Sequence, residues 1–256
     1  VVEKKNIPQW FIKITKYADE LLSGLEDLEH WPDQVKTMQR NWIGKSRGIN
    51  ITFNVKDKEF NHHQLEVYTT RPDTLMGVTY LALAPEHPLT SDLSKKNNDI
   101  AKFVKRCSRQ KVSEEEFATV SKIGIDTGLK AIHPLTNDLL PIWVGNYVLI
   151  DYGSGAVMAV PGHDQRDFEF AKKYNLKIKQ VVSLDKKDTS INEKAIIEKG
   201  NLINSGKYND LTFNEAFSAI AEDLKKLNQG EVTSNYRLRD WGCLLYTSPS
   251  PRDDVI

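Results

Sequence analysis

A strand, a turn and the start of a helix follow one another in Ala156-Val157-Met158-Ala159-Val160-Pro161-Gly162-His163-Asp164-Gln165-Arg166-Asp167. The run from Ala156 to Val160 predicts a strand, and Pro161-Gly162 is typical of a turn. A helix predicted from Asp164 to Tyr174 would carry Asp164 and Asp167 on one face, because residues three apart are neighbours on a helix. The stretch therefore predicts two carboxylates at one rim of a sheet.

The two carboxylates could hold a cationic group. Both are expected to be ionised at neutral pH, because the amide N–H groups and dipole of a helix N-terminus stabilise negative charge. On spacing alone a structural use is more frequent, with Asp164 as N-cap and Asp167 as a surface charge paired with Arg166 or Lys172. A metal site from His163, Asp164 and Asp167 is weaker, since it would need further ligands.

A second motif, Thr69-Thr70-Arg71-Pro72-Asp73-Thr74, places three hydroxyls and a cation where a strand enters a turn. Threonine hydroxyls can donate to a carbonyl oxygen or hold a water, and Arg71 could bind a phosphate or carboxylate. Strand propensity, capping by Asp73 or Thr74 and a solvated ion pair are more frequent uses of these residue types. No Ser/His/Asp or Cys/His arrangement is evident, so a hydrolase built on these motifs would use water as nucleophile.

Short strands alternate with amphipathic helices along the chain. Ile49, Ile51, Phe53 and Val55 alternate with polar residues, which predicts a strand with one buried face. The same reasoning predicts strands at 65–69, 78–83, 143–150 and 156–160 and helices at 11–28, 32–42, 99–109, 113–121, 164–174 and 214–227. This succession indicates a compact α+β module rather than a regular doubly wound sheet. The polar, glycine-containing residues 44–48 predict a flexible joint and a domain boundary.

Composition excludes several classes of protein. The 256 residues carry 35 Lys and Arg against 35 Asp and Glu, so no global basic field attracts nucleic acid. Cys107 and Cys243 lack metal-ligand spacing and suggest no disulfide scaffold. No apolar run approaches the roughly 18 residues of a membrane helix, and no signal peptide opens the chain, so we expect a cytoplasmic fragment with no membrane partner.

The C-terminal residues differ in character from the rest. Cys243 to Asp253 resembles the in-frame translation of a transposase adapter used in sequencing libraries. We therefore expect residues 243–256 to be an artefact and disordered, the alternative being a natural Pro/Ser-rich terminus.

Several segments together resemble the editing insertion of the bacterial-type leucyl-tRNA synthetase family, with short flanks from the class I synthetic domain. The matching segments run in the family's order over nearly all of residues 1–242: Pro8–Thr15, Met38–Gly44, Tyr68–Gly77, Gly153–Tyr174 and Arg237–Gly242. The resemblance implies an α+β editing domain with a β-barrel-like core of short strands and surrounding helices. It also implies a flank at 1–46, an editing domain at 47–234 and a return to the synthetic domain at 235–242.

The resemblance further implies roles for individual residues. Asp167 matches the aspartate that binds the α-ammonium of the misattached amino acid, and Thr74 matches the threonine that blocks leucine. Thr69 and Thr70 match threonines that contact the substrate ester and the terminal ribose. The remaining matches are pocket residues and a nearby arginine: Arg71, Tyr152, Met158, Val160 and Asp164.

The implied reaction is hydrolysis of the ester that joins tRNA-Leu to norvaline, isoleucine or methionine, by a monomer and without a cofactor. ATP and Mg²⁺ would serve only the complete leucine–tRNA ligase, because the HIGH-like and KMSKS-like signatures are absent here. Alternatives are a valyl-tRNA synthetase editing domain, which shares the TTRP-type motif, a tRNA-binding module without activity, and a freestanding editing hydrolase. Gly162 to Phe170 and the synthetase-like flanks favour the leucyl family, while Asp167 and Thr74 favour activity.

Overall fold

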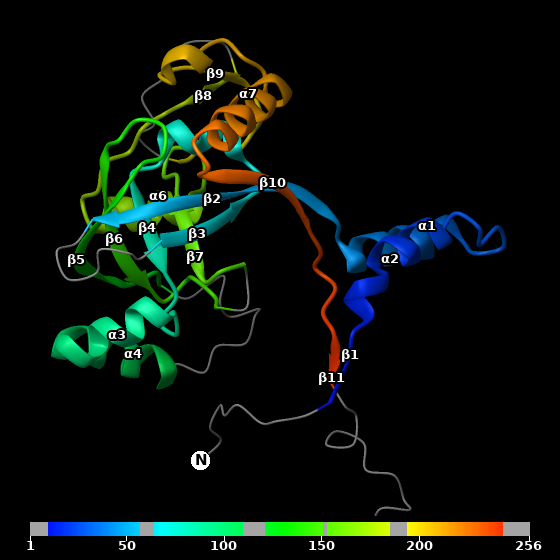
Figure 1. Cartoon of the computed structure of the whole chain (residues 1–256), viewed down its shortest axis with the longest axis horizontal. Coiled ribbons are helices and arrows are strands. Elements are labelled where there is room, and N and C mark those ends of the chain that lie inside the picture. The colour runs from blue at the N-terminus through cyan, green and yellow to red at the C-terminus, as the bar shows by residue number, and fades with distance from the viewer. Residues whose placement is uncertain (1–9, 57–63, 110–120, 151–152, 185–193, 243–256) are drawn as a thin grey trace, which may run out of the picture. The chain divides into compact units, whose positions relative to one another are not determined.

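A computed structural model of the chain describes residues 10–56, 64–109, 121–150, 153–184 and 194–242 (Figure 1). The chain divides into two compact units, one formed by residues 48–233 and the other by the segments before and after that range. Several predictions lie outside the described residues, namely Tyr152, most of the helix expected at 113–121, and the tail 243–256. Within the described ranges no helix is long and apolar enough to cross a membrane.

The larger unit contains a mixed sheet. Its strands are β2 (Ser46–Lys56), β3 (Gln64–Thr69), β4 (Tyr80–Leu83), β5 (Gly124–Ile132), β6 (Leu139–Gly145), β7 (Ala156–Ala159) and β10 (Gly230–Asn235). They are ordered β10-β2-β5-β6-β4-β7, with β3 also paired to β2. β4 and β6 are parallel, whereas β2 with β3 and β4 with β7 are antiparallel.

The expected barrel-like core is not confirmed, because the strands of the described residues form no closed barrel. β7 lies near β3, but among the described residues no strand pairing joins the two. The coarser prediction of an α+β fold is confirmed by the helices that accompany the sheet. They are η2 (Pro72–Gly77), α3 (Pro88–Lys96), α4 (Asn98–Arg109), α6 (Gln165–Lys173), η3 (Gly206–Tyr208) and α7 (Phe213–Lys226), with a small ladder of β8 (Val182–Ser183) and β9 (Asn201–Leu202).

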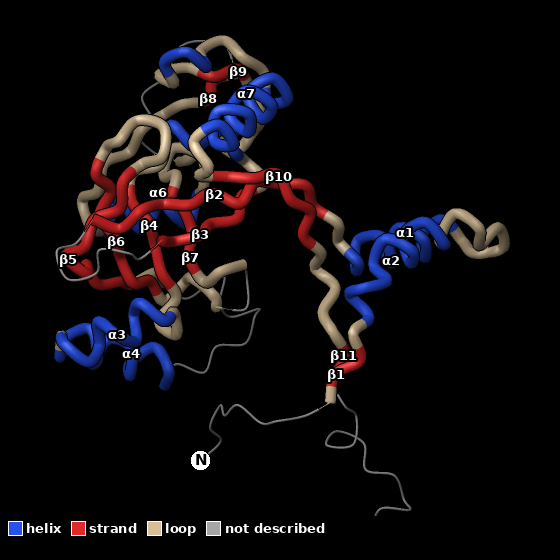
Figure 2. The backbone as a smooth tube through the Cα atoms, viewed as in Figure 1, coloured by secondary structure: helices blue, strands red, loops and turns tan. Residues whose placement is uncertain are grey.

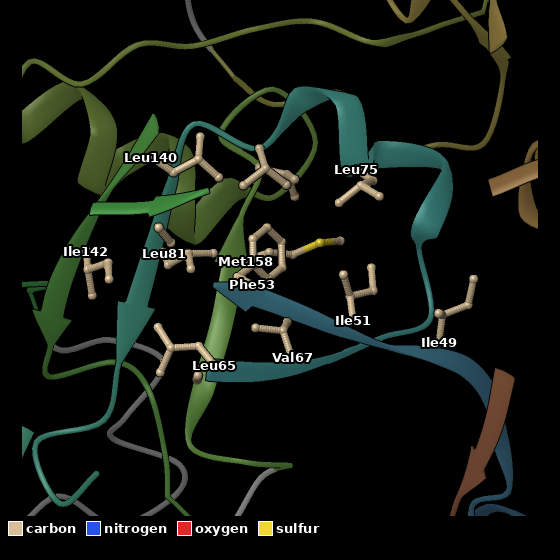
Figure 3. Packing of buried hydrophobic residues seen from close by; sticks show 14 of the residues in the cluster. Ile49, Ile51, Phe53, Leu65, Val67, Leu75, Leu81, Leu140, Ile142 and Met158 are labelled. Atoms are coloured by element: carbon tan, nitrogen blue, oxygen red, sulfur yellow. The ribbon is translucent and has the colours of Figure 1, made fainter. Parts of the chain in front are cut away.

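Side chains from several strands meet in the main core. Alternate residues of β2 point into it, with Ile49, Ile51 and Phe53 fully buried, which confirms the predicted alternation. Figure 3 shows these side chains gathered with others from β3, β4, β6, β7 and η2. Burying such apolar surface is the main stabilising contribution to a fold of this size.

A second cluster fixes the position of α6. Phe170 is fully buried, stacks on Tyr80 with ring centroids 5.4 Å apart and lies nearly perpendicular to Trp143 with ring centroids 5.5 Å apart. The rings belong to α6, β4 and β6, so the helix that carries Asp167 is held against the sheet on its apolar face. The predicted helices at 164–174 and 214–227 are confirmed as α6 and α7 (Figure 2).

The smaller unit is formed by both ends of the described chain. It contains β1 (Phe11–Ile12), η1 (Ile14–Tyr17), α1 (Ala18–Gly24), α2 (Asp33–Ile43) and β11 (Trp241–Gly242), with β1 and β11 antiparallel. The Oγ1 of Thr15 donates to Asp240 at 2.7 Å, which joins segments 225 positions apart. Pro32 directly precedes α2, as predicted.

Some predicted boundaries were wrong for identifiable reasons. In place of the helix expected at 11–28, β1 and η1 precede a shorter α1. At the joint expected at 44–48, Gly44 is left-handed (φ 57°), β2 begins at Ser46, and the two compact units divide between residues 47 and 48. The strand expected at 143–150 ends at Gly145. Tyr147 and Val148 are buried as strand residues would be, but they lie in the turn that follows the strand. β5 was not predicted, because a bulge near Gly128 (φ 77°) breaks the alternation of apolar and polar residues along this strand.

Candidate functional site

The turn that begins with Thr69 is held by hydrogen bonds within itself. Arg71 Nη2 lies 2.8 Å from Asp73 Oδ2, and the Asp73 side chain is fully buried. The Thr69 hydroxyl accepts from the Arg71 amide at 3.0 Å, and the Thr74 hydroxyl donates to the Arg71 carbonyl at 2.8 Å. Arg71 and Asp73 thus pair with each other, and the hydroxyls of Thr69 and Thr74 bond the backbone of Arg71 within the same turn.

Asp164 caps the N-terminus of α6. Its Oδ1 accepts from the amides of Arg166 at 2.8 Å and Asp167 at 3.2 Å, which confirms the structural use expected from spacing. Arg166 also forms an ion pair with it at 3.0 Å. The cap fixes where α6 begins, and hence where Asp167 lies.

Asp167 is not the surface charge that spacing alone favoured. Only 6% of it is exposed, and its Oδ2 accepts from the Val160 amide at 2.8 Å. The Tyr80 hydroxyl donates to the backbone carbonyl of Asp167 at 3.4 Å and lies 3.0 Å from the Tyr147 hydroxyl. The carboxyl group is therefore almost fully shielded from solvent, between the end of β7 and the first turn of α6.

This environment corrects the expectation that both carboxylates are ionised. Burial, and then the charge of Asp164, raise the pKa of Asp167 to about 8, although the Val160 amide opposes the shift. Burial also pushes the pKa of Asp164 upward, but Arg166 and the helix amides hold it below its ordinary value. Desolvation from packing outweighs the helix dipole at Asp167, so at pH 7 Asp164 is ionised and Asp167 is mostly protonated.

One segment connects the two motifs. The Arg71 Nη1 donates to the Ile197 carbonyl at 3.0 Å. The adjacent Ile196 accepts from Nδ1 of His163 at 2.9 Å and donates its amide to the Gly162 carbonyl at 2.9 Å. Because Ile196 and Ile197 are neighbours in sequence, this segment bridges the TTRPDT turn and the Gly162–Asp167 turn.

The other residues implied by the resemblance differ in their burial. Met158 and Val160 are each 8% exposed and belong to the main core, where Met158 lies among the side chains of Figure 3. Thr69 is half-buried and Thr70 is exposed at the end of β3. Tyr152 is among the residues that the structure does not describe.

Sequence reasoning missed His163 and Asp73 as organising residues. His163 was considered only as a metal ligand, but within the described ranges no three His, Cys, Asp or Glu side chains gather in a metal-binding cluster. Its burial between two turns depends on segments 18 to 33 positions away, and only the Gly162-His163 pair in a turn hints at it. Asp73 could have been recognised from its Arg-x-Asp spacing.

A hollow of about 740 Å³ lies elsewhere in the larger unit. Its lining comes from β2, β3, α7 and β10: Asn50, Thr52, Glu66, Ala221, Glu222, Lys225, Asn228, Gly230, Glu231 and Val232. None of the residues implied by the resemblance lines it, so we do not assign the chemistry to this hollow.

Replacing Asp167 with Asn is expected to stabilise the chain increasingly as pH rises. The pKa of Asp167 is higher in the folded than in the unfolded chain, so the folded state holds a proton that the unfolded state loses, and stability falls from about pH 4 to about pH 8. An asparagine side chain cannot ionise and can still accept from the Val160 amide. Urea unfolding at pH 5 and pH 8 measures the difference, which should grow by several kcal/mol; an equal difference at both pH values contradicts the raised pKa.

Residues 40–225 match the family model described as "Leucyl-tRNA synthetase, editing domain", which places the module among the editing domains of aminoacyl-tRNA synthetases. Leucine–tRNA ligases of Marinobacter nauticus and Hahella chejuensis are 60% and 58% identical over 243 residues, which cover 94% of this chain and 28% of each relative. The chain belongs to the leucyl-tRNA synthetase family, as the sequence resemblance predicted.

A solved structure agrees with the match. The leucyl-tRNA synthetase of Agrobacterium radiobacter, described as a ternary LeuRS–tRNA–LeuAMS complex, superposes with a TM-score of 0.72 at 34% identity over 94% of this chain and 26% of that protein. This chain thus spans about 28% of the length of the curated relatives. The valyl-tRNA synthetase alternative is not supported by these matches.

Proposed function

We propose that residues 47–234 form an editing domain that hydrolyses the ester between tRNA-Leu and a wrong amino acid such as norvaline, isoleucine or methionine. We further propose that 1–46 and 235–242 belong to the synthetic domain of a leucine–tRNA ligase. The compact unit of residues 48–233 and the family match over 40–225 support these limits. The observation that carries the function is the segment of Ile196 and Ile197, which bridges the hydroxyl-bearing turn and the turn that leads to the buried Asp167.

The physical need for such a site follows from the limits of hydrophobic recognition. One methylene changes binding in an apolar pocket by only about 1–3 kcal/mol, so near-isosteres of leucine pass a synthetic site too often. A second pocket that excludes leucine by size supplies the missing discrimination. Thr74 is 1% exposed and its hydroxyl is tied to Arg71, so its methyl would form a fixed wall for such a pocket.

The proposed reaction uses water as nucleophile. Water attacks the ester carbonyl carbon, the oxyanion forms and then collapses, and the bond to the ribose oxygen breaks. The proton lost by water ends on that oxygen, giving free amino acid and tRNA. Thr69 and Thr70 would contact the ester and the terminal ribose, and Asp167 would hold the α-ammonium so that the carbonyl carbon is presented in one orientation.

The raised pKa of Asp167 is consistent with a site whose carboxyl group ionises when a cation binds beside it. Without ligand the buried carboxyl keeps its proton, and an ammonium group placed beside it would favour the ionised form. Binding would therefore exchange a proton for a substrate cation. ATP and Mg²⁺ belong, in this proposal, to amino-acid activation by the complete ligase and not to the editing step.

Incubating the full chain with Ile-tRNA-Leu and with Leu-tRNA-Leu tests the proposal. We expect the isoleucyl ester to be hydrolysed and the leucyl ester to be spared by about 100-fold. The rate should rise between pH 6 and about 8 as Asp167 ionises, and then fall as the α-amino group, with a pKa of about 8, loses its proton. Equal rates for the two esters, or none above the spontaneous rate, would refute the proposed function.

A further inference from the structure

His163 joins the turn before α6 to two segments that are distant in sequence, residues 181–182 and residue 196. Its Nε2 lies 2.9 Å from the Val181 amide and 3.2 Å from the Val182 amide, and its Nδ1 lies 2.9 Å from the Ile196 carbonyl. The residue is 5% exposed. We infer that His163 is a positioning residue, which holds the start of α6 and the segment bound to Arg71 in one fixed arrangement; this inference rests on the proposed function.

The three partners determine the state of the ring. Two amide N–H groups point at Nε2, so this nitrogen must carry a lone pair and no proton. The proton is then on Nδ1, where it is donated to the Ile196 carbonyl. Only the neutral Nδ1–H tautomer satisfies all three contacts at once, and the other tautomer would leave two buried amides and a carbonyl without this partner.

The surroundings favour this neutral form. Burial lowers the pKa of His163, and the bond with the Ile196 carbonyl opposes that shift. Of the charged groups, Arg71 lowers the pKa and Asp73 raises it. At neutral pH the ring therefore stays uncharged and keeps its acceptor for the two amides.

The contacts of His163 extend to both motifs. The Ile196 amide donates back to the Gly162 carbonyl, and the next residue, Ile197, accepts from Arg71 at 3.0 Å. On the other side, the segment that contains Val181 also holds Lys179, whose Nζ donates to the Met76 carbonyl in η2 at 2.8 Å. A shift of the imidazole would consequently change the distance between the α6 start and the threonine turn.

Close backbone packing makes the arrangement intolerant of movement. A Cβ at Gly162 would lie 2.4 Å from the Lys179 carbonyl oxygen, so the turn before His163 has no room for a larger residue.

A second buried histidine acts similarly on η2. His133 Nε2 contacts the Leu75 carbonyl at 3.0 Å, while its Nδ1 accepts from the Leu135 and Thr136 amides.

Nuclear magnetic resonance of the full chain tests the tautomer directly. Nitrogen shifts of the His163 ring at pH 7 should show a protonated Nδ1 and an unprotonated Nε2. The Val181 and Val182 amides should exchange slowly with solvent and become faster in His163→Leu. A protonated Nε2, or exchange unaffected by the substitution, would overturn the inference without bearing on hydrolysis.

Deacylation of Ile-tRNA-Leu tests the positioning role. At a temperature well below each variant's Tm, His163→Leu should lower the single-turnover rate constant about tenfold, because misplaced groups lose catalytic efficiency steeply. His163→Gln, whose Oε1 can still accept from the two amides, should recover most of that loss. Tyr208→Phe is the control: it removes the 2.6 Å hydrogen bond from the buried Tyr208 to Asp223 in the same unit, and should lower Tm while leaving the rate unchanged.

The outcomes separate the two proposals. A wild-type chain that does not deacylate Ile-tRNA-Leu overturns the proposed function and, with it, this inference. An active wild type together with an unchanged rate in His163→Leu overturns this inference alone. Equal rate losses in His163→Leu and Tyr208→Phe would show that general destabilisation, not positioning, causes the effect, and would overturn it as well.

Discussion

Replacing Asp167 with Ala is expected to slow hydrolysis of Ile-tRNA-Leu by about 1,000-fold. Truncating one partner of a buried charge pair costs roughly 2–5 kcal/mol, and Asp167 is only 6% exposed at the place where the ammonium would bind. The substitution also removes the acceptor for the Val160 amide, so the expected loss combines substrate binding with local geometry. Single-turnover deacylation of the full chain measures it.

Two variants separate these contributions. Asp167→Asn keeps an acceptor for Val160 but cannot ionise, so it should lose most of the activity while remaining folded. Asp99→Asn is the matched control, because Asp99 also lies in the first turn of a helix, α4, but its side chain is exposed. Activity in Asp167→Asn equal to that of wild type would remove Asp167 from the role of ammonium anchor.

Replacing Thr74 with Ala is expected to make the chain hydrolyse Leu-tRNA-Leu about 100-fold faster than the wild type does. The side chain is almost fully buried and its rotamer is fixed by the bond to the Arg71 carbonyl, so its removal opens space for a γ-branched side chain. The lost hydrogen bond should lower stability by only about 1 kcal/mol. Parallel assays with leucyl and isoleucyl esters measure the change in specificity.

Isosteric variants identify the atom responsible. Thr74→Val keeps the volume without the hydroxyl and should still spare Leu-tRNA-Leu, whereas Thr74→Ser keeps the hydroxyl without the methyl and should hydrolyse it. A Thr74→Ala chain that continues to spare the leucyl ester would show that another residue forms the wall.

A part of the site could be recognised from the sequence when the residues that form it are close together in the chain. The cap formed by Asp164 involves residues two and three positions away, and the alternation of β2 is a property of one strand, so both were predictable. Asp73 pairs with Arg71 two positions away, yet its complete burial comes from the surrounding fold. The catalytic and binding roles of Asp167, Thr74, Thr69 and Thr70 stay predictions based on family resemblance.

Other features depend on residues that are far apart in the chain. Tyr80, Tyr147 and Val160 meet Asp167 only after β4, the turn after β6 and the end of β7 have packed against α6. His163 finds its partners at Val181 and Ile196 in the same way. No local pattern encodes these neighbours.

The sequence alone determined the family, the α+β class and the helix that begins at Asp164, because motif identity, apolar periodicity and capping are carried by neighbouring residues. The tertiary structure decided that Asp167 is buried and holds its proton near neutral pH, that the buried His163 ring is neutral, and that the described strands do not close into a barrel. These properties follow from desolvation and packing by distant segments, and both exist only after the chain has folded.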